Sequence, residues 1–405
     1  MAAATDSTHS GVLKRIYPFD EIERMMYENN PAYAMTPKKH DFFGNEMHRA
    51  IRVAATAGRS KDFATAKANK QASVIERLLI TTVEDYSLYS VSGKLVRQTS
   101  NSKGALVNAL TDEVDSAMDA MNRAFGYGVY TNKGGAIARV SASQTLTSTT
   151  LSLITADDIV KIEKNQYLTF AATDGTSGSV KAGRVKVTAV DRDAGTCTVD
   201  AALSTAVPTI ATSDYIFPEG DFGEAMSGYD GWVPSTAPTA GDSFFSLDRS
   251  TDPTRLAGSR ISATTLQIEE AVKKALQVGV RNGCKTSHIF MNDKNFLDLD
   301  LSLGSQKRYV DTTTGKVGFT GIQFVGHGSK PVEVYPDPNC PLNIAYGVQM
   351  DQWTIEGPGQ FPFIDATDGD KILREESSDA FEGRIKSYHQ MICKSPGRNW
   401  RLALA

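Results

Sequence analysis

The sequence predicts an α+β protein, because it combines strand-like runs with strong amphipathic helices. Two apolar strand-like runs flank a charged linker within residues 46–82, a strong amphipathic helix covers 102–126, and short β-rich runs recur from 140 to 218. The 405 residues contain 40% hydrophobic and 22% charged side chains, which is ordinary for a globular chain of roughly two to three domains.

Residues 1–45 predict an N-terminal arm with one short helix near Ile22, and residues 46–82 predict an extended β-ribbon. The apolar side chains of the ribbon recur at regular spacing: Ile51, Val53 and Ala55 in the outgoing run, and Ile75, Leu79 and Val83 in the returning run. A two-stranded ribbon has no core of its own and is marginal alone in water. Its exposed edges favour pairing with another chain, so this segment points to assembly.

The tip of the ribbon combines four cations with one acid, Asp62; the cations are Arg59, Lys61, Lys67 and Lys70. Two interpretations stay open, a solvated loop and a docking loop that contacts an acidic neighbour. A lysine–asparagine isopeptide involving Asn69 would need a buried acid and a dry pocket. We therefore expect non-covalent docking at the tip.

Residues 102–126 form the clearest helix of the chain, because apolar residues recur every three to four positions. Ser102 is a candidate N-cap, and Gly126 or Gly128 a candidate end. The expected core positions are Leu106, Leu110, Val114, Met118 and Met121. The polar side carries an acidic group that includes Asp112, Asp115 and Asp119.

Residues 140–218 predict an inserted small β-barrel or sandwich, because short runs rich in Thr, Val and Ala alternate with turn signals. Five strands are expected, at 157–164, 166–173, 183–190, 196–203 and 214–220. Residues 219–260 are rich in Gly, Pro and Ser and predict connecting loops. A second helix is expected at 264–279, with Glu269 and Glu270 able to pair with Lys273 and Lys274 at i,i+4. A strand–helix unit and five strands follow.

No motif for catalysis, nucleotides or metals is evident. Gly315-Lys316 lacks the preceding glycine and the following Ser or Thr of a phosphate-binding loop. The acidic stretch 365–376 departs from a calcium loop at its third and fifth positions. The six histidines and four cysteines are dispersed, which predicts no zinc site and incidental, reduced thiols. We expect no enzyme activity, no metal and no cofactor.

The net charge of −4 provides no overall basic field, so strong sequence-independent nucleic-acid binding is not expected. No apolar run is long enough to cross a membrane, and the N-terminus lacks the layout of a signal peptide.

The order of these parts resembles the major capsid protein of tailed bacteriophages. That family has the Hong Kong 97 phage-type capsid fold, and the resemblance is to its branch with a β-barrel insertion domain. It rests on the ribbon piece GRSKDFATAKANKQAS, the piece VTAVDRDAGTCTV followed by DYIF, and the linker DRSTDPTRLAGSR. Each motif is weakly specific, and their order along most of the chain carries the resemblance.

The resemblance implies a division into an N-terminal arm, an extended loop, a peripheral domain and an axial domain. The arm would cover 1–45, the loop 46–82, and the peripheral domain 83–139 with 102–126 as its spine helix. C-terminal strands at about 376–405 would complete the peripheral domain, and the axial domain would cover 261–375. The insertion would occupy 140–218 and the connecting loops 219–260.

The function implied is that of a coat protein forming hexamers and pentamers, which tile an icosahedral head around double-stranded DNA. The expected partners are further copies of the chain, a separate scaffolding protein, a portal, a possible decoration protein and weakly contacted DNA. Assembly is expected in the bacterial host cytoplasm, and the mature location is the virion. The alternatives are an encapsulin-like nanocompartment shell, an enzyme with a β-rich accessory domain, and a surface or tail-tube protein.

Overall fold

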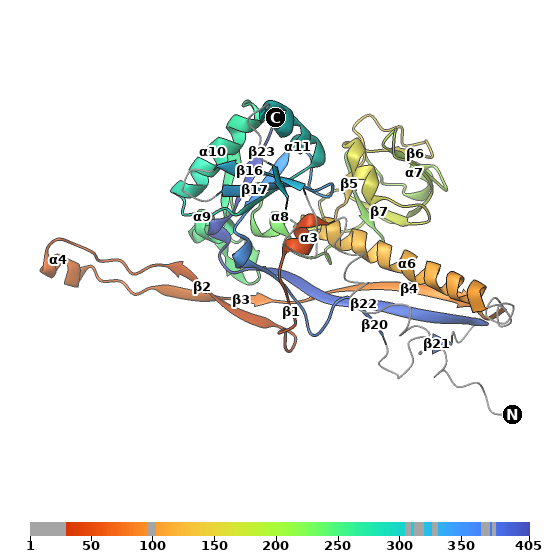
Figure 1. The fold of residues 1–405 in the computed structure, drawn as a ribbon, viewed down its shortest axis with the longest axis horizontal. Helices are drawn as coiled ribbons and strands as arrows, with labels where there is room; N and C mark the ends of the chain where they lie inside the picture. Colours follow the sequence, from red (N-terminus) through yellow and green to blue (C-terminus); the bar gives the residue numbers. More distant parts are fainter. Residues whose placement is uncertain are drawn as a thin grey trace.

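The structure, a computed structural model, describes most of the chain: residues 30–94, 103–303, 309–311, 320–325, 331–365, 373–374 and 378–405. Only the backbone is described at 103–112, 309–311, 320–321 and 323–325. An elongated body carries a long ribbon at one end and a compact lobe above the other (Figure 1). The helix expected near Ile22, the Ser102 cap and the Gly315-Lys316 pair lie outside the described residues.

The ribbon is a separate two-stranded sheet of β2 (Met47–Ala54) and β3 (Val74–Ile80), with helix α4 (Phe63–Ala68) at its tip. The strands are antiparallel, and their register shifts between Arg52 and Ala54. Near the base, Ile51 is buried, as are two residues of β3, Leu78 and Ile80. Ile75 lies opposite Arg52 and is 58% exposed, so the regular spacing of the returning run does not mark one buried face.

The peripheral part is a six-stranded sheet beneath α6 (Lys103–Gly128), the helix expected at 102–126 (Figure 1). Its centre is the 14-residue strand β22 (Ala380–Cys393), which pairs with β4 (Val83–Ser92) along the full length of β4. Helix α6 packs on β4 through apolar residues that include Val114, Met118 and Met121. The remaining strands are β1 (Lys38–Lys39), β19 (Trp353–Glu356), β20 (Phe363–Ile364) and β21 (Leu373–Arg374).

The lobe beside α6 is a six-stranded β-structure with its own hydrophobic core. The chain enters at β5 and leaves at β10, which pair with each other, and a bridge between Val140 and Leu153 brings the two ends of the strand order together. A barrel therefore closes. Its strands are β5 (Ala138–Arg139), β6 (Thr150–Ser152), β7 (Tyr167–Ala171), β8 (Val185–Asp191), β9 (Thr196–Val199) and β10 (Tyr215–Pro218).

Two short helices complete the barrel, and one of them corrects a strand prediction. Residues 157–164 were expected to be a strand, but Ala156–Lys161 form the 3-10 helix η1, which buries Ile159. The second helix is α7 (Leu203–Ala206). The hairpin expected at DRDAG is confirmed between β8 and β9, where Gly195 adopts a positive φ of 64°.

The axial part is a mixed seven-stranded sheet in the order β13-β23-β18-β14-β17-β16-β15. Helices α10 (Ile268–Arg281) and α11 (Asp293–Leu303) pack their apolar residues into the same core as its strands. The strands are β13 (Ser259–Ser262), β14 (His288–Met291), β15 (Tyr309–Asp311), β16 (Thr320–Val325), β17 (Pro331–Pro336), β18 (Ile344–Val348) and β23 (Trp400–Ala403).

Helix α10 differs from its prediction in two details. It begins at Ile268, four residues later than expected. The Glu269–Lys273 pair forms as expected, but the Lys274 ammonium donates to the Ser262 carbonyl, 2.9 Å away, and not to Glu270. The strand–helix unit β14–α11 is confirmed.

The C-terminal strands are divided between the two sheets, which corrects the expected assignment. Strand β23 lies within the range expected to be peripheral but pairs with β13 and β18 in the axial sheet. Conversely, β19 and β20 lie within 261–375, the range expected to be axial, but pair with β22 in the peripheral sheet. The sequence pattern predicted a strand at β19 but none at β20 or β23, and it did not identify the partners of any of the three.

The segment 219–260 is more than a set of surface loops. It contains α8 (Tyr229–Trp232), α9 (Pro253–Ala257), the hairpin β11 (Ser243–Phe244)–β12 (Leu247–Asp248) and the 3-10 helix η2 (Arg249–Thr251). Tyr229 and Trp232 are fully buried and pack edge-to-face on Trp353. The segment is therefore part of the main core. The remaining short helices are α3 (Pro31–Met35), η4 (Met350–Gln352) and η5 (Pro396–Arg398).

Candidate assembly surfaces

The ribbon base is attached to the body by apolar packing of Ile51, Leu78 and Ile80 in the main core, and by an ion pair and two hydrogen bonds. The guanidinium of Arg49 binds the carboxylate of Glu356 on β19, and Glu356 is completely buried. The amide of Leu79 donates to the carbonyl of Phe245 at 2.9 Å, and Nη1 of Arg255 donates to the carbonyl of Val53 at 3.2 Å. Past this base the ribbon extends away from the body (Figure 1).

The ribbon tip is a capped helical turn and not an unstructured loop. The Asp62 carboxylate accepts hydrogen bonds from the amide of Thr65 at 2.8 Å and from its hydroxyl at 2.7 Å. These two hydrogen bonds, the backbone one being the larger influence, lower the pKa of Asp62. An N-cap of this kind orders the first turn of a helix, so Lys67, the cation within α4, is held on a defined scaffold.

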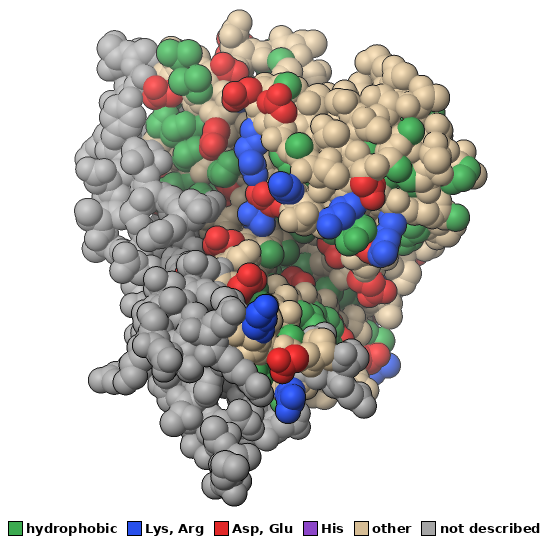
Figure 2. Space-filling model, turned by 90° about the vertical axis from the view of Figure 1, so that its right-hand side faces the viewer, with side chains coloured by type: hydrophobic (Ala, Val, Ile, Leu, Met, Phe, Trp, Pro, Cys, Tyr) green, Lys and Arg blue, Asp and Glu red, His purple; other side chains and the backbone are tan. Residues whose placement is uncertain are grey.

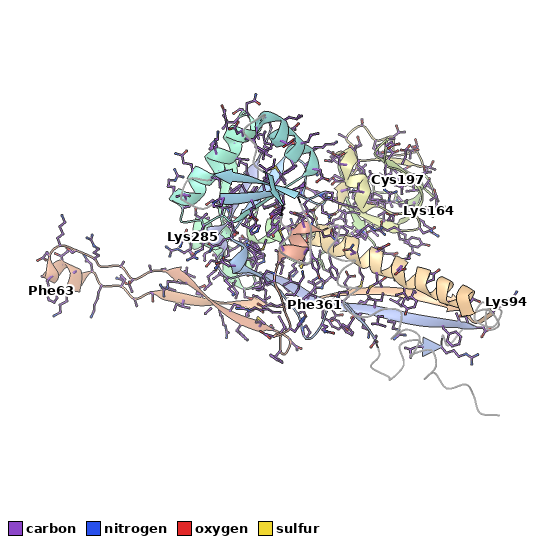
Figure 3. All side chains as sticks on the ribbon, in the orientation of Figure 1. Phe63, Lys94, Lys164, Cys197, Lys285 and Phe361 are labelled. Carbon is purple, nitrogen blue, oxygen red and sulfur yellow. The ribbon has the colours of Figure 1, made fainter. Side chains whose placement is uncertain are left out.

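All four predicted cations of the tip are exposed: Arg59, Lys61, Lys67 and Lys70. Phe63, the first residue of α4, is 82% exposed at the far end of the ribbon (Figure 3). Sequence reasoning missed Phe63, although a single aromatic residue in a charged segment is a recognisable signal. A large exposed aromatic ring beside cations is typical of an interface residue.

The acidic side of α6 is partly placed by the structure. Asp119 is exposed and Asp115 is half-buried, whereas the side chain of Asp112 lies outside the described residues. Glu113 is exposed on the same helix. Of the expected core positions, Val114, Met118 and Met121 are buried, and the side chains of Leu106 and Leu110 are not described.

Within one chain the basic tip and the acidic helix do not meet. The tip lies at one end of the long axis, and α6 lies beyond the axial part toward the other end (Figure 1). If these two surfaces bind each other, they must belong to different copies.

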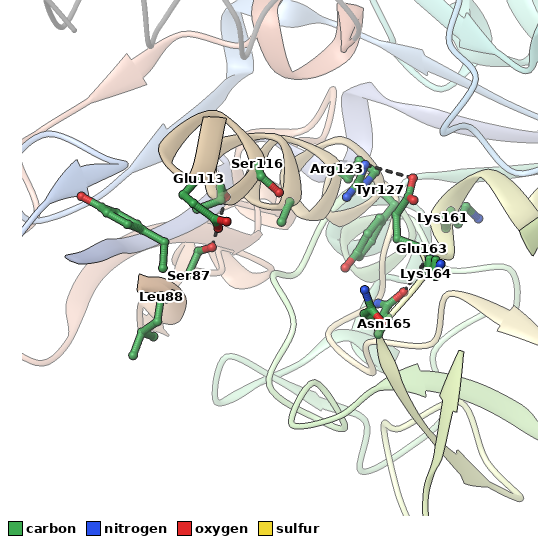
Figure 4. Close-up of a pocket in the computed structure, with 14 residues that line it drawn as sticks. Ser87, Leu88, Glu113, Ser116, Arg123, Tyr127, Lys161, Glu163, Lys164 and Asn165 are labelled. Atoms are coloured by element: carbon green, nitrogen blue, oxygen red, sulfur yellow. Dashed lines mark hydrogen bonds and ion pairs between the residues drawn. The ribbon is translucent and has the colours of Figure 1, made fainter. Parts of the chain in front are cut away.

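A groove of about 490 Å³ runs between the outer side of α6, strand β4 and the barrel. Ser87 and Leu88 of β4 and Glu113 of α6 line one part, and Glu163 and Lys164 of the barrel line another (Figure 4). In the view from this end of the molecule, the surface is hollowed below the barrel, with charged side chains around the hollow (Figure 2).

Two ion pairs link the barrel to its neighbours. Arg123 of α6 binds Glu163 at 3.0 Å across the groove, and Lys294 of α11 binds Asp157 of η1 at 2.7 Å. Both pairs are partly exposed, so each contributes at most about 1 kcal/mol.

Two carboxyl groups close to the barrel junction have raised pKa values. Burial raises the pKa of Asp85, on the α6-facing side of β4, to about 6. Burial and, to a smaller degree, the charge of Asp85 raise the pKa of Asp221, which follows β10, to about 7. Sequence reasoning missed both groups, because they are more than a hundred residues apart and neither lies in a motif.

The titratable groups of the core are structural. Burial lowers the pKa of His389 to about 3, and its ring packs between Phe125 and Phe361. All four cysteines are buried and free, and burial raises the pKa of Cys197 and Cys393 to about 12. In the described part of the chain, His, Cys, Asp and Glu form no group that could hold a metal ion. No helix there is long and apolar enough to span a bilayer.

The comparisons with known proteins are informative at the level of the fold. No family model matches the sequence, and no curated protein matches it. A solved cyanophage A-1(L) capsid structure matches with a TM-score of 0.52 and 12% identity, over 96% of this chain and 94% of that chain. The chain therefore has the Hong Kong 97-type capsid fold, as expected from the sequence.

Two further matches have lower TM-scores. A Mycobacterium phage Ogopogo structure matches with a TM-score of 0.43 and 10% identity over 93% of each chain. An encapsulin complex from Synechococcus elongatus matches with a TM-score of 0.44 and 8% identity over 100% of this chain and 96% of that one.

Proposed function

We propose that this chain is the major capsid protein of a tailed phage, which assembles through hexamers and pentamers into an icosahedral head enclosing double-stranded DNA. The ribbon carries this proposal, on a chain whose fold matches a phage capsid structure over nearly its whole length. The ribbon projects from the body, no described strand pairs with its edges, and its tip exposes an aromatic ring, so contact with another subunit would stabilise it.

The geometry of the ribbon supports ring-like assembly. Among the described residues the acidic side of α6 lies far from the tip of the same chain, so a contact between these two surfaces of identical copies would be head-to-tail. Head-to-tail contacts generate closed rings when the rotation between subunits closes. Hexamers and pentamers are rings of this kind.

We propose that the tip docks on the acidic side of a neighbour's α6. Arg59, Lys61, Lys67 and Lys70 are exposed cations, and the helix presents Asp119 with Asp115 beside it. We extend the acidic surface to Asp112 on the basis of the sequence. Opposite charges of this kind set the register and the association rate of an interface more than its affinity.

The remaining partners follow from the same proposal. A head of this type would need a portal for DNA entry, and we propose a separate scaffolding protein to direct its assembly. The closed barrel forms a lobe beside α6 that a decoration protein could bind. The mildly acidic chain would contact the packaged DNA only weakly. Assembly would take place in the cytoplasm of the bacterial host, the finished shell would be part of the virion, and no catalytic step is assigned to the chain.

The decisive experiment is size-exclusion chromatography of the expressed chain, followed by negative-stain imaging. Shells of megadalton size or ring-shaped capsomers are expected. A stable monomer at high protein concentration would overturn the proposal. The nucleic-acid content of shells recovered from phage-producing cells then separates a genome container from a nanocompartment, because the latter would hold protein cargo.

A further inference from the structure

We infer that the ion pair between Arg49 and Glu356 sets the angle at which the ribbon leaves the body, so that Arg49 is a positioning residue for assembly. This inference deepens the proposed function, because a docking ribbon must point in a defined direction. Its test uses the unassembled chain, so it can fail while the capsid proposal stands.

The two residues come from different parts of the molecule. Arg49 lies on β2 of the ribbon, opposite Leu78, and Glu356 is the last residue of β19 in the peripheral sheet. No residue between 55 and 73 contributes to this contact, so the ion pair lies at the base, where a small rotation moves the tip by a large distance. It is therefore well placed to control direction.

The buried environment of Glu356 makes the loss of its ion pair with Arg49 energetically unfavourable. Its side chain is completely buried, and Thr354 donates a hydrogen bond of 2.8 Å to Oε1. Oε2 of Glu356 and Nε of Arg49 are both buried and have no hydrogen-bond partner among the described residues. A buried carboxylate that loses its counter-ion is strongly unfavourable, so the ribbon cannot swing away without exposing or neutralising Glu356.

The other contacts at the base restrain the ribbon less. The Leu79–Phe245 and Arg255–Val53 hydrogen bonds both involve backbone carbonyls, which water can replace as the ribbon moves. Water cannot take the place of the Arg49 counter-ion beside a buried carboxylate in the same way. Ile51, Leu78 and Ile80 also pack in the main hydrophobic core, but apolar burial is not directional, so the ion pair is the contact that fixes the angle.

Lys39 provides a matched control. It lies opposite Glu356 on the neighbouring strand β1, so both side chains leave the same side of the sheet. It is a partly buried cation in register with Glu356, but it belongs to the body and not to the ribbon. Its removal changes the local charge without removing the connection to the ribbon.

The experiment measures the ribbon angle as a distance between two spin labels in the unassembled full-length chain. The labels are attached at Ala64→Cys on α4 and at Lys285→Cys on the axial part, both exposed positions. The four native cysteines are buried, and burial raises the pKa of Cys284 to about 11, so they stay unlabelled. Hydrogen exchange at the amide of Leu79 gives a second readout.

We expect a narrow distance distribution in the parent chain and in Arg49→Lys and Lys39→Gln. Glu356→Gln keeps the shape of the side chain and removes the buried charge, so it should fold, broaden the distribution and speed Leu79 exchange by about tenfold or more. Arg49→Gln should broaden the distribution in the same way. A narrow distribution in Glu356→Gln and Arg49→Gln would overturn the inference, and so would equal broadening in Lys39→Gln.

Discussion

The ribbon and the barrel both project from the body, yet they are stabilised in opposite ways. The barrel closes on itself around buried residues such as Phe170 and Val187, and the Val140–Leu153 bridge completes the closure. In the described part of the chain no further strand pairs with either edge of the ribbon, and its tip exposes Phe63. The barrel is therefore complete within one chain, whereas the ribbon needs a second surface. A projecting ribbon whose edge strands leave backbone groups without strand partners indicates that another surface binds there.

The largest expected effect is in the barrel core. Phe170→Ala removes a fully buried ring, so the free energy of unfolding should fall by about 3–5 kcal/mol. Urea unfolding followed by far-ultraviolet circular dichroism measures this loss. Phe63→Ala at the ribbon tip is the matched control, because its ring is already in water and its loss should change stability by less than about 0.5 kcal/mol. A similar loss in both variants would contradict the contrast between the two projections.

The next effect concerns assembly and not stability. Reversing Lys61, Lys67 and Lys70 to Glu should lower shell yield by about a hundredfold at low salt, because like charges then face a neighbour's acidic helix. Shell yield is measured by sedimentation, with the melting temperature as a check on folding.

The control for this variant reverses three exposed lysines elsewhere, Lys133, Lys285 and Lys394. It changes the net charge equally and should assemble normally. Unchanged yield and salt stability in the tip variant would show that the tip does not dock through its charges.

A smaller effect depends on pH at the barrel junction. The pKa of Asp221 is raised from 3.8 to about 7 in the folded chain, so the folded state holds its proton more tightly than the unfolded state. The stability that this group contributes is fully present below about pH 4 and is lost as pH rises toward 7.

Asp221→Asn should remove this dependence. The difference in unfolding free energy between the parent chain and the variant should change by at most about 1.4 kcal/mol for each pH unit between pH 4 and pH 7, with the parent chain losing stability as pH rises. Denaturant titrations at several pH values measure it. A flat difference curve would show that Asp221 titrates normally.

The smallest expected effect is at the contact between the barrel and α11. Lys294→Ala removes a partly exposed ion pair with Asp157, so the free energy of unfolding should fall by less than about 1 kcal/mol. Calorimetry that resolves a separate barrel transition would measure it. A loss of several kcal/mol would mean that the barrel depends on this contact and is less self-sufficient than its core indicates.

The sequence predicted the elements whose signal is local. The repeat through Val114 and Met118 identified the spine helix, and alternation around Val185 and Val187 identified β8. The sequence-based prediction was wrong where the local hydrophobic pattern does not match the packing that the segment adopts. Residues 157–164 alternate like a strand, but Ile159 is buried from a 3-10 helix, and β5 and β6 are too short to show any period. The axial pairing of β23 is a long-range property that alternation does not encode.

The candidate site shows the same limit. The basic tip residues were found because they are close together in the sequence. The groove, by contrast, is lined by Ser87, Glu113 and Lys164, which only the fold brings near one another. In the sequence, Glu356 looks like an ordinary strand residue. Its burial beside Arg49 depends on a contact between residues 307 positions apart in the chain.

The path of the chain into and out of the barrel has a consequence for how the molecule can vary. The amide of Ile137 donates to the carbonyl of Ile216 at 2.9 Å, so the entry and exit strands lie side by side. A lobe attached through one neighbouring pair of strands can be lengthened, exchanged or removed while the rest of the chain keeps its course. This junction is therefore the natural position for grafting a foreign domain that would be displayed once per subunit.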